Sequence, residues 1–447
     1  MARSADAHYN AVAAKDPSGA TGLRREIGFV DATTIVISGI IGGGIFFTPA
    51  TVAQALPSGF WIILAWCTGA VIAFAGALTF AELGSRFPHA GGHYLYIRDA
   101  FGGLPAFLYG WMLLLIIATG ALASLALAFA GYVSAFLPMS PMQQRLFGVS
   151  TIVVLSIINV LGVKPGTRTT TVLTIFKVAG LAVLIAGGLL VPHTATAAVM
   201  LADTNLVQGF AAALVPILFT YGGWQQLNFV AGEVKDAQRV VPRALAAGVV
   251  VVALVYVGAN LVYLRALQPQ GMATATAIAQ SAAQVLFGDV ASRAITVLIA
   301  VSILAFSNVV VMVTPRVFYA MARDRVFLKE LAEIHPRFNT PAKAIALQGI
   351  WGIVLVMAGS VGALVNGVVF ADWIFFGLGA ASLFVFRKRS REQPVYQTPG
   401  YPIVPAFFVL AALIAVASAV YTYPTESLIG IAMLAAGSVF YHIRKPS

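Results

Sequence analysis

Charged residues are scarce in this 447-residue chain, of which Asp, Glu, Lys and Arg make up 10% and hydrophobic residues 60%. Because a soluble domain typically carries about 25% charged residues, this composition excludes an ordinary soluble protein. The charges lie between long apolar runs, which occur at residues 27–50, 60–82, 98–136, 145–162, 169–191, 207–231, 244–266, 291–320, 343–361, 363–386, 403–421 and 427–443. Runs of this kind span a bilayer as helices. The sequence therefore predicts an all-α polytopic membrane protein with 12 transmembrane helices.

Cysteine and mid-membrane histidine are nearly absent as well. The one cysteine, Cys67, lies inside the second run, which excludes an intramolecular disulfide and an external cysteine that would hold a partner subunit. None of the six histidines falls in the middle of a run, and no set of metal ligands or nucleophile–base pair occurs at that depth. A membrane-embedded enzyme is therefore disfavoured, and no metal or other cofactor is expected. A channel is disfavoured because no repeated pore loop or acidic ring is visible.

The first 26 residues lack an apolar core, which argues against a cleaved signal peptide. We expect a mobile polar tail at 1–26, a single membrane domain at 27–443 and a short C-terminal segment at 444–447.

The net charge of +11 fits membrane topology better than nucleic acid binding. If the N-terminus is cytoplasmic, the outward-facing segments contain only three basic residues, Arg145, Arg265 and Arg293. Lys177 and Arg316 lie within runs, and every other lysine and arginine faces the cytoplasm. This bias follows the positive-inside rule. It predicts cytoplasmic termini, contact with anionic lipid headgroups and no nucleic acid partner.

The first and sixth runs carry glycine clusters in mid-membrane, SGIIGGGI at residues 38–45 and FTYGGW at residues 219–224. Because each glycine costs a helix about 1 kcal/mol relative to alanine, both runs are predicted to break. Close helix packing through small residues is the alternative. Matched breaks in two oppositely oriented halves indicate an inverted-repeat transporter. The repeats would be 27–191 and 207–387, with two further helices at 403–443.

A break in mid-membrane has a chemical use. It leaves free N–H groups where one half-helix begins and free C=O groups where the other ends. The N–H groups attract a carboxylate and the C=O groups an ammonium. A bilayer tolerates such backbone only where it lines a protein cavity. Two breaks facing one cavity therefore predict a receptor for a zwitterion.

The same segments resemble a known family. Residues 38–46 resemble the first-span signature of the amino acid–polyamine–organocation (APC) superfamily. Residues 219–229, followed by Glu233 and residues 242–244, resemble the sixth span of its L-type amino acid transporters, and the stretches at 81–94, 159–164 and 316–324 agree. The resemblance covers residues 25–443. It implies a LeuT-type fold with a five-plus-five inverted repeat, alternating access and an amino acid substrate.

The resemblance also implies a substrate site. It places the substrate carboxylate on the backbone N–H groups of Gly43 and Gly44, and the α-ammonium near the carbonyls of Ile40, Phe219 and Gly222. Phe219 resembles an aromatic lid, with ordinary helix packing as the alternative reading. The candidate substrate-binding residues are Ile40, Ile41, Gly42, Gly43, Gly44, Phe219, Thr220, Gly222 and Gln225.

Three departures from the family refine the prediction. The chain has no external cysteine, so no disulfide-linked heavy subunit is expected. Relatives that accept cationic amino acids or cystine place aspartate at the position of Gly222, and its absence favours neutral substrates. His93 stands in the loop after the second run where relatives often carry an acid, and we expect a solvated histidine there.

Charges inside the membrane are functional candidates because they are costly. Lys177 matches the fifth-span lysine of sodium-independent relatives, which takes the place of a coupling ion, and is predicted to donate to carbonyls freed near Ile40 and Ile41. Asp372 could face the substrate, pair with a polar group or sit in the interior of its helix.

Three further polar residues of the eighth run have alternative roles. Arg316 is predicted to extend to the membrane surface or to pair with Asp324 or Glu82. Ser307 and Asn308 could line the pocket or bond neighbouring helices.

The sequence thus predicts a sodium-independent secondary transporter for neutral L-amino acids in the cell membrane, either an exchanger or proton-coupled. Cationic amino acids or polyamines are the alternative substrates.

Overall fold

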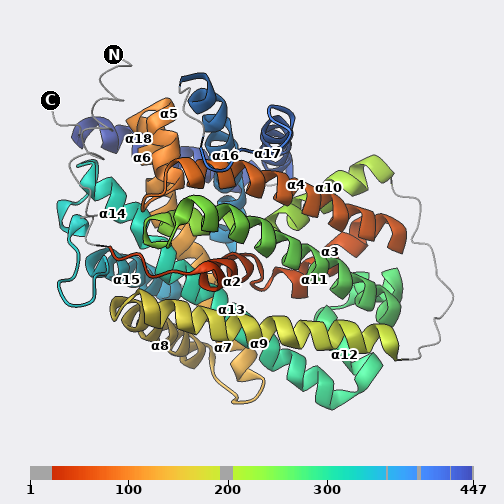
Figure 1. Cartoon of the computed structure of the whole chain (residues 1–447). Helices are drawn as coiled ribbons and strands as arrows, with labels where there is room; N and C mark the ends of the chain where they lie inside the picture. Colours follow the sequence, from red (N-terminus) through yellow and green to blue (C-terminus); the bar gives the residue numbers. More distant parts are fainter. Residues whose placement is uncertain (1–22, 192–204, 359–360, 390–393, 423, 445–447) are drawn as a thin grey trace.

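The computed structural model of the chain describes residues 23–191, 205–358, 361–389, 394–422 and 424–444 (Figure 1). The predicted tail up to residue 22 and the last three residues lie outside this range. Most of the described residues are helical, as predicted, and their one β-type pairing is an isolated bridge between Ile27 and Val234.

The first half of the chain forms ten helical elements. They are α2 (Phe29–Ile40), η1 (Gly44–Phe46), α3 (Thr48–Ala55), α4 (Gly59–Arg86), α5 (His93–Phe101), α6 (Gly103–Met112), the π-helical turn η2 (Leu113–Ile117), α7 (Ala118–Ser134), α8 (Pro141–Val160) and α9 (Val163–Leu190). The second half contains α10 (Leu206–Thr220), η3 (Trp224–Glu233), α11 (Ala237–Thr274), α12 (Ile278–Phe287), α13 (Asp289–Val313), α14 (Pro315–Arg323), η4 (Lys329–Ala332), α15 (Ala342–Ala358), α16 (Val361–Arg389), α17 (Ile403–Thr422) and α18 (Pro424–Arg444).

Within the described residues, nine helical segments are long and apolar enough to cross a bilayer. The chain is therefore a multi-pass membrane protein, and the count of 12 spans stays a prediction. The first predicted span is divided by its break into the short helices α2 and α3, and α15 in the ninth run has only 17 residues.

Helix α2 lies at the centre of the bundle. It packs against α9, α11, α13 and η3, and Figure 1 shows it between α9 and α11. All of its residues from Thr34 to Ile40 are buried, which fits the nearly continuous apolar sequence of this segment. The end of α2 is the first glycine break, so the break lies in the interior of the protein.

The segment just before α2 is held in place, contrary to the mobile tail predicted up to residue 26. The amides of Glu26 and Ile27 both donate to the carbonyl of Glu233, at 2.9 and 3.0 Å, and the amide of Lys235 donates to Ile27 at 2.9 Å. Leu23 and Ile27 are buried. The polar composition of the segment did not indicate this docking, because any sequence can make the backbone hydrogen bonds that hold it.

Candidate functional site

The first break follows Ile40, where α2 ends. Residues 41–43 are not helical, and a single 3-10 turn leads into α3. The carbonyl of Ile40 accepts from the Gly42 amide at 2.9 Å and from the Tyr256 hydroxyl at 3.0 Å. The carbonyl of Ile41 accepts from Lys177 Nζ at 2.5 Å and from Ser302 Oγ at 3.2 Å. Side chains from three helices therefore satisfy the carbonyls that the break exposes.

The amides after the break have no such partners. Among the described residues, none accepts a hydrogen bond from the Gly43 or Gly44 N–H group. Both glycines are partly exposed rather than buried. An unpaired N–H inside a membrane protein is costly, so a ligand that accepts hydrogen bonds from these two groups is favoured. They are the two amides to which the family resemblance assigns the substrate carboxylate.

The second break follows Thr220, where α10 ends. Tyr221 and Gly222 form a turn, and Gly223 has a φ of +109°, a left-handed conformation that glycine adopts without strain. The Phe219 carbonyl is used within the turn, since it accepts from the Gly222 amide at 3.1 Å. In the described part of the chain the Gly222 carbonyl has no donor, and Gly222 is partly exposed.

The two breaks touch each other. A Cβ on Gly223 would overlap the Gly39 carbonyl, and a Cβ on Gly44 would lie 2.7 Å from the Thr220 methyl carbon. The Thr48 and Thr220 hydroxyls are hydrogen-bonded at 2.7 Å, and the Tyr256 hydroxyl lies 3.0 and 3.2 Å from the Ile40 and Thr220 carbonyls. The glycines therefore also allow close packing, which was the alternative interpretation, and this packing occurs at the breaks themselves.

Lys177 makes the predicted contact. Its side chain is fully buried on α9, and Nζ lies 2.5 Å from the Ile41 carbonyl and 3.1 Å from Ser38 Oγ. The amine therefore joins α9 to the last turn of α2 and to the break beyond it. Ser302 on α13 supports the same backbone and also donates to Gly42 at 2.9 Å.

The other predicted site residues lie in different surroundings. Phe219, at the end of α10, is 44% exposed, whereas Gln225 is buried and its Oε1 accepts from the Gly223 amide at 3.0 Å. Gln225 thus stabilises the second break from inside. Asp372 on α16 is partly buried and makes no hydrogen bond or ion pair with any described residue. This leaves its carboxylate available, and its contact with substrate stays a prediction.

Ser307 and Asn308 are fully engaged in protein contacts. The Asn308 amide group donates to the Gly166 carbonyl at 3.0 Å and to Thr170 Oγ1 at 2.9 Å, and its oxygen accepts from Asn159 at 2.8 Å. Ser307 donates to its own helix at 2.9 Å. Of the two roles considered for Asn308, these contacts are those of the residue that bonds neighbouring helices.

His93 is not the solvated loop residue that we expected. It begins α5, has no exposed surface, and its Nε2 lies 2.7 Å from the Phe375 carbonyl of α16. The rings of Phe80 and Tyr109 lie with their centroids 4.9 and 4.6 Å from the imidazole. The histidine packs so closely because residue 379 is glycine, where a Cβ would overlap the imidazole.

Arg316 is fully buried, and its partner is neither of the acids predicted. Its Nε lies 2.7 Å from Oε1 of Glu233, and its second terminal nitrogen lies 3.0 Å from Oε2. The bidentate pair joins α14 to Glu233 at the end of η3. The backbone carbonyl of the same Glu233 accepts the hydrogen bonds that hold the segment before α2. Glu82 instead pairs with Arg387 and Arg86, and Asp324 pairs with Arg98.

Sequence reasoning missed two residues that hold the breaks together. Tyr256 and Ser302 are buried polar groups in otherwise apolar stretches of α11 and α13. That isolation was a usable signal, because a hydroxyl buried in a membrane needs a partner. Sequence alone could not say that the partners are the freed carbonyls.

The described residues thus form a multi-pass helical membrane protein in which two interrupted helices meet and expose unpaired backbone groups, the construction of a membrane carrier. Comparison with known proteins agrees with this class. The sequence profile of the amino acid permease family matches residues 27–439, and the chain belongs to this family. The predicted membership of an amino acid transport family within the APC superfamily is therefore confirmed.

Individual relatives are similar over nearly the whole chain. The serine/threonine exchanger SteT of Bacillus subtilis is 31% identical over 432 residues, which cover 95% of this chain and 98% of SteT. The human b(0,+)-type amino acid transporter 1 is 30% identical over 95% of this chain and 88% of its own length. The human large neutral amino acids transporter small subunit 2 is 31% identical over 95% and 81%.

Proposed function

We propose that the chain is a sodium-independent exchanger of neutral L-amino acids that works by alternating access. One observation carries the proposal: the unpaired amides of Gly43 and Gly44 and the unpaired carbonyl of Gly222 lie at two breaks that are in contact. Two adjacent N–H donors suit a carboxylate, and a carbonyl suits an ammonium. These are the two groups that every amino acid carries, so the backbone recognises the substrate class.

The carbonyls of Ile40 and Phe219, which the family resemblance assigns to the ammonium, already have donors in this conformation. We therefore give the Gly222 carbonyl the main part in binding the ammonium. Phe219 is the lid, because it is 44% exposed at the end of α10, just before the second break. Ile41, Gly42 and Thr220 shape the site through backbone and packing contacts.

Sodium independence rests on Lys177. A coupling sodium ion binds to oxygen atoms, and here a lysine amine already bonds the Ile41 carbonyl and the Ser38 hydroxyl. A permanent amine fulfils the structural role of the ion but cannot be released with the substrate. A fixed amine fits an exchanger or a facilitator, and we propose an exchanger because the similar protein SteT is named as one. An amine that loses its proton during the cycle would instead couple transport to a proton gradient.

We further propose the topology that the sequence predicts. The five-plus-five repeats are 27–191 and 207–387, helices at 403–443 are additional, and both termini are cytoplasmic. The protein works in the cell membrane without a cofactor and without a disulfide-linked heavy subunit. Cys67, which is partly buried on α4, supports the last point because it is the chain's one cysteine.

Neutral substrates are favoured because the backbone site contains no acid, and the names of two relatives, a serine/threonine exchanger and a large neutral amino acids transporter, agree. Cationic amino acids are the second candidate. The unpaired carboxylate of Asp372 favours them, as does the similarity to a b(0,+)-type transporter.

Competition in proteoliposomes tests this choice. Alanine and serine should displace a labelled neutral substrate better than arginine does, in the presence of choline or sodium alike, and Asp372→Asn should leave this order unchanged. If arginine competes best in the wild type and loses its advantage in Asp372→Asn, the protein transports cationic amino acids. A substrate whose mass changes during the assay would indicate an enzyme instead.

A further inference from the structure

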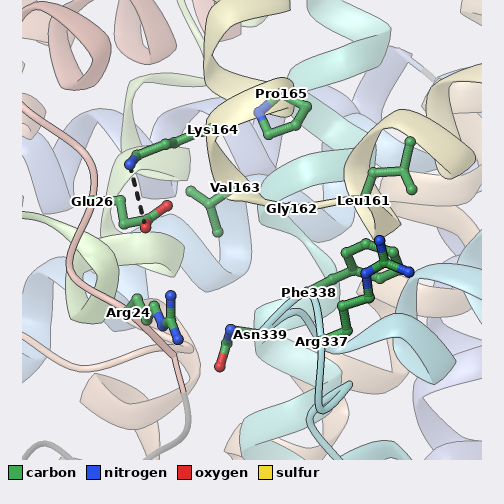
Figure 2. A pocket seen from close by; sticks show the side chains of 10 residues that line it. All are labelled: Arg24, Glu26, Leu161, Gly162, Val163, Lys164, Pro165, Arg337, Phe338 and Asn339. Atoms are coloured by element: carbon green, nitrogen blue, oxygen red, sulfur yellow. Dashed lines mark ion pairs between the residues drawn. The ribbon is translucent and has the colours of Figure 1, made fainter.

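A cavity of about 200 Å³ lies away from the two breaks, at the end of the bundle that we assign to the cytoplasm (Figure 2). Three separate segments line it: the chain before α2, the turn between α8 and α9, and the loop after η4. The lining residues are Arg24, Glu26, Leu161, Gly162, Val163, Lys164, Pro165, Arg337, Phe338 and Asn339.

The walls of the cavity are well fixed. The loop is closed by a backbone bond from His335 to Thr340 at 2.9 Å, and the Thr340 hydroxyl donates to the Val160 carbonyl at the end of α8, at 2.8 Å. Glu26 is held through its amide to Glu233 at 2.9 Å. The cavity is therefore built from anchored backbone.

Each of the three segments contributes one cation. Lys164 lies 3.7 Å from Glu26, a loose pair with the lysine 71% exposed. Arg24 and Arg337 have no carboxylate within ion-pair distance in the described part of the chain, and Arg337 rests on the Phe338 ring at 5.4 Å. Figure 2 shows Arg24, Lys164 and Arg337 on different sides of the cavity. Three cations against one acid leave the cavity electropositive.

The start of α9 adds to this charge. Gly162 has a φ of +143° and turns the chain sharply, so that the first turn of the 28-residue helix α9, Val163 to Pro165, forms one wall. The positive end of the helix dipole thus faces the same space as the cations. The volume lies below the range of about 300–1,000 Å³ that is usual for sites of larger ligands, which suits a small anion or a headgroup rather than a nucleotide.

We propose that this cavity binds a phosphoryl group, and that the bound group joins the chain before α2 to α9 and to the loop after η4. A phosphoryl group offers several oxygens in a tetrahedral arrangement, so cations on three sides can bind it together. The group comes either from free phosphate or diphosphate in the cytoplasm or from an anionic lipid headgroup. Because the bound group bridges segments that pack together in this conformation, it stabilises the folded protein.

Thermal unfolding of the purified full-length chain in a neutral detergent tests the proposal. Sodium pyrophosphate and dihexanoyl phosphatidylglycerol are titrated separately, with sodium chloride at equal ionic strength and dihexanoyl phosphatidylcholine as the matched probes. The double variant Arg24→Gln, Arg337→Gln removes the two cations that lack an acidic partner, so its fold should be unaffected. Lys388→Gln removes an exposed basic residue at the end of α16, outside the cavity.

We expect at least one of the two anionic probes to raise the unfolding temperature in a saturable way in the wild type and in Lys388→Gln. The double variant should need about tenfold more of that probe or more, since two charge-assisted contacts are lost. A response to pyrophosphate alone identifies a soluble ligand, and a response to phosphatidylglycerol alone identifies a lipid headgroup. If neither probe exceeds its matched control, or if the double variant responds like the wild type, the proposal is wrong. Transport is not measured, so this outcome leaves the proposed exchange function intact.

Discussion

Replacing Lys177 by methionine tests how the first break is held. Methionine keeps most of the volume of the side chain and removes only the amine, so little of the effect comes from a cavity. Two hydrogen bonds are lost, at 2.5 Å to the Ile41 carbonyl and at 3.1 Å to Ser38 Oγ. Ser302 still donates to Ile41 at 3.2 Å, so the carbonyl keeps one partner.

The magnitude follows from these contacts. A hydrogen bond between neutral groups contributes about 0.5–1.5 kcal/mol and one to a charged group about 1.5–3 kcal/mol. The free energy of unfolding should therefore fall by about 1–3 kcal/mol if the amine is neutral. The ceiling is about 6 kcal/mol if it is charged, reduced by the desolvation that the variant no longer suffers. Exchange should be nearly abolished, because the end of α2 and the first break are no longer hydrogen-bonded to α9.

Thermal unfolding and counterflow in proteoliposomes measure both quantities. Arg168→Met is the matched control on the same helix, since this arginine is exposed and forms no ion pair with a described residue; its effect should stay below about 1 kcal/mol. Near-normal exchange by Lys177→Met, in a variant as stable as the control, would refute the role of Lys177.

Three further predictions concern other parts of the protein. Gly44→Val should abolish exchange in a protein that still reaches the membrane, because its Cβ would lie 2.7 Å from the Thr220 methyl carbon and fill the carboxylate's place. Gly131→Val, whose Cβ has nothing within 4 Å, should transport normally. Equal uptake by the two variants would contradict the proposed site. Glu233→Gln should lower the free energy of unfolding by about 3–5 kcal/mol, because it leaves the buried Arg316 without its charged partner. Glu333→Gln, which breaks an exposed ion pair, should lower it by less than about 1 kcal/mol. Similar losses in thermal unfolding would show that the buried pair stabilises the protein no more than the exposed one. Burial, and then the charge of Arg25, lower the pKa of His89 below its ordinary value of 6.5. As the pH falls, the unfolded chain therefore takes up a proton before the folded chain does, and the unfolding temperature decreases once the pH is below about 6.5. This decrease should be smaller in His89→Gln than in the wild type.

The sequence predicted the backbone features of the site better than its side-chain contacts. Glycine clusters identified both breaks, because helix propensity is local and two or three adjacent glycines change it strongly. The contact of Lys177 was also predictable, since a buried amine in an apolar helix must find oxygen atoms and the first break supplies them.

Contacts between distant segments were harder to predict. His93 looked like a loop residue because it lies between two apolar runs, directly after two glycines, but its environment is made by Phe80, Tyr109 and Phe375, which come from other helices. Arg316 had two candidate acids in the sequence-based topology, Asp324 and Glu82, and only the fold brings Glu233 to it. Such pairings depend on how helices pack, which hydrophobic periodicity does not specify.

Counterflow with whole and partial substrates tests the central claim most directly. Proteoliposomes are loaded with alanine, with propionate, which lacks the ammonium, or with ethylamine, which lacks the carboxylate, and uptake of labelled alanine is followed in sodium-free buffer. A site built from the free amides of Gly43 and Gly44 and the free carbonyl of Gly222 needs both groups of the zwitterion. Internal alanine should therefore drive uptake, and neither propionate nor ethylamine should do so. Uptake that requires sodium, or that ethylamine or propionate drives as well as alanine does, would contradict the account.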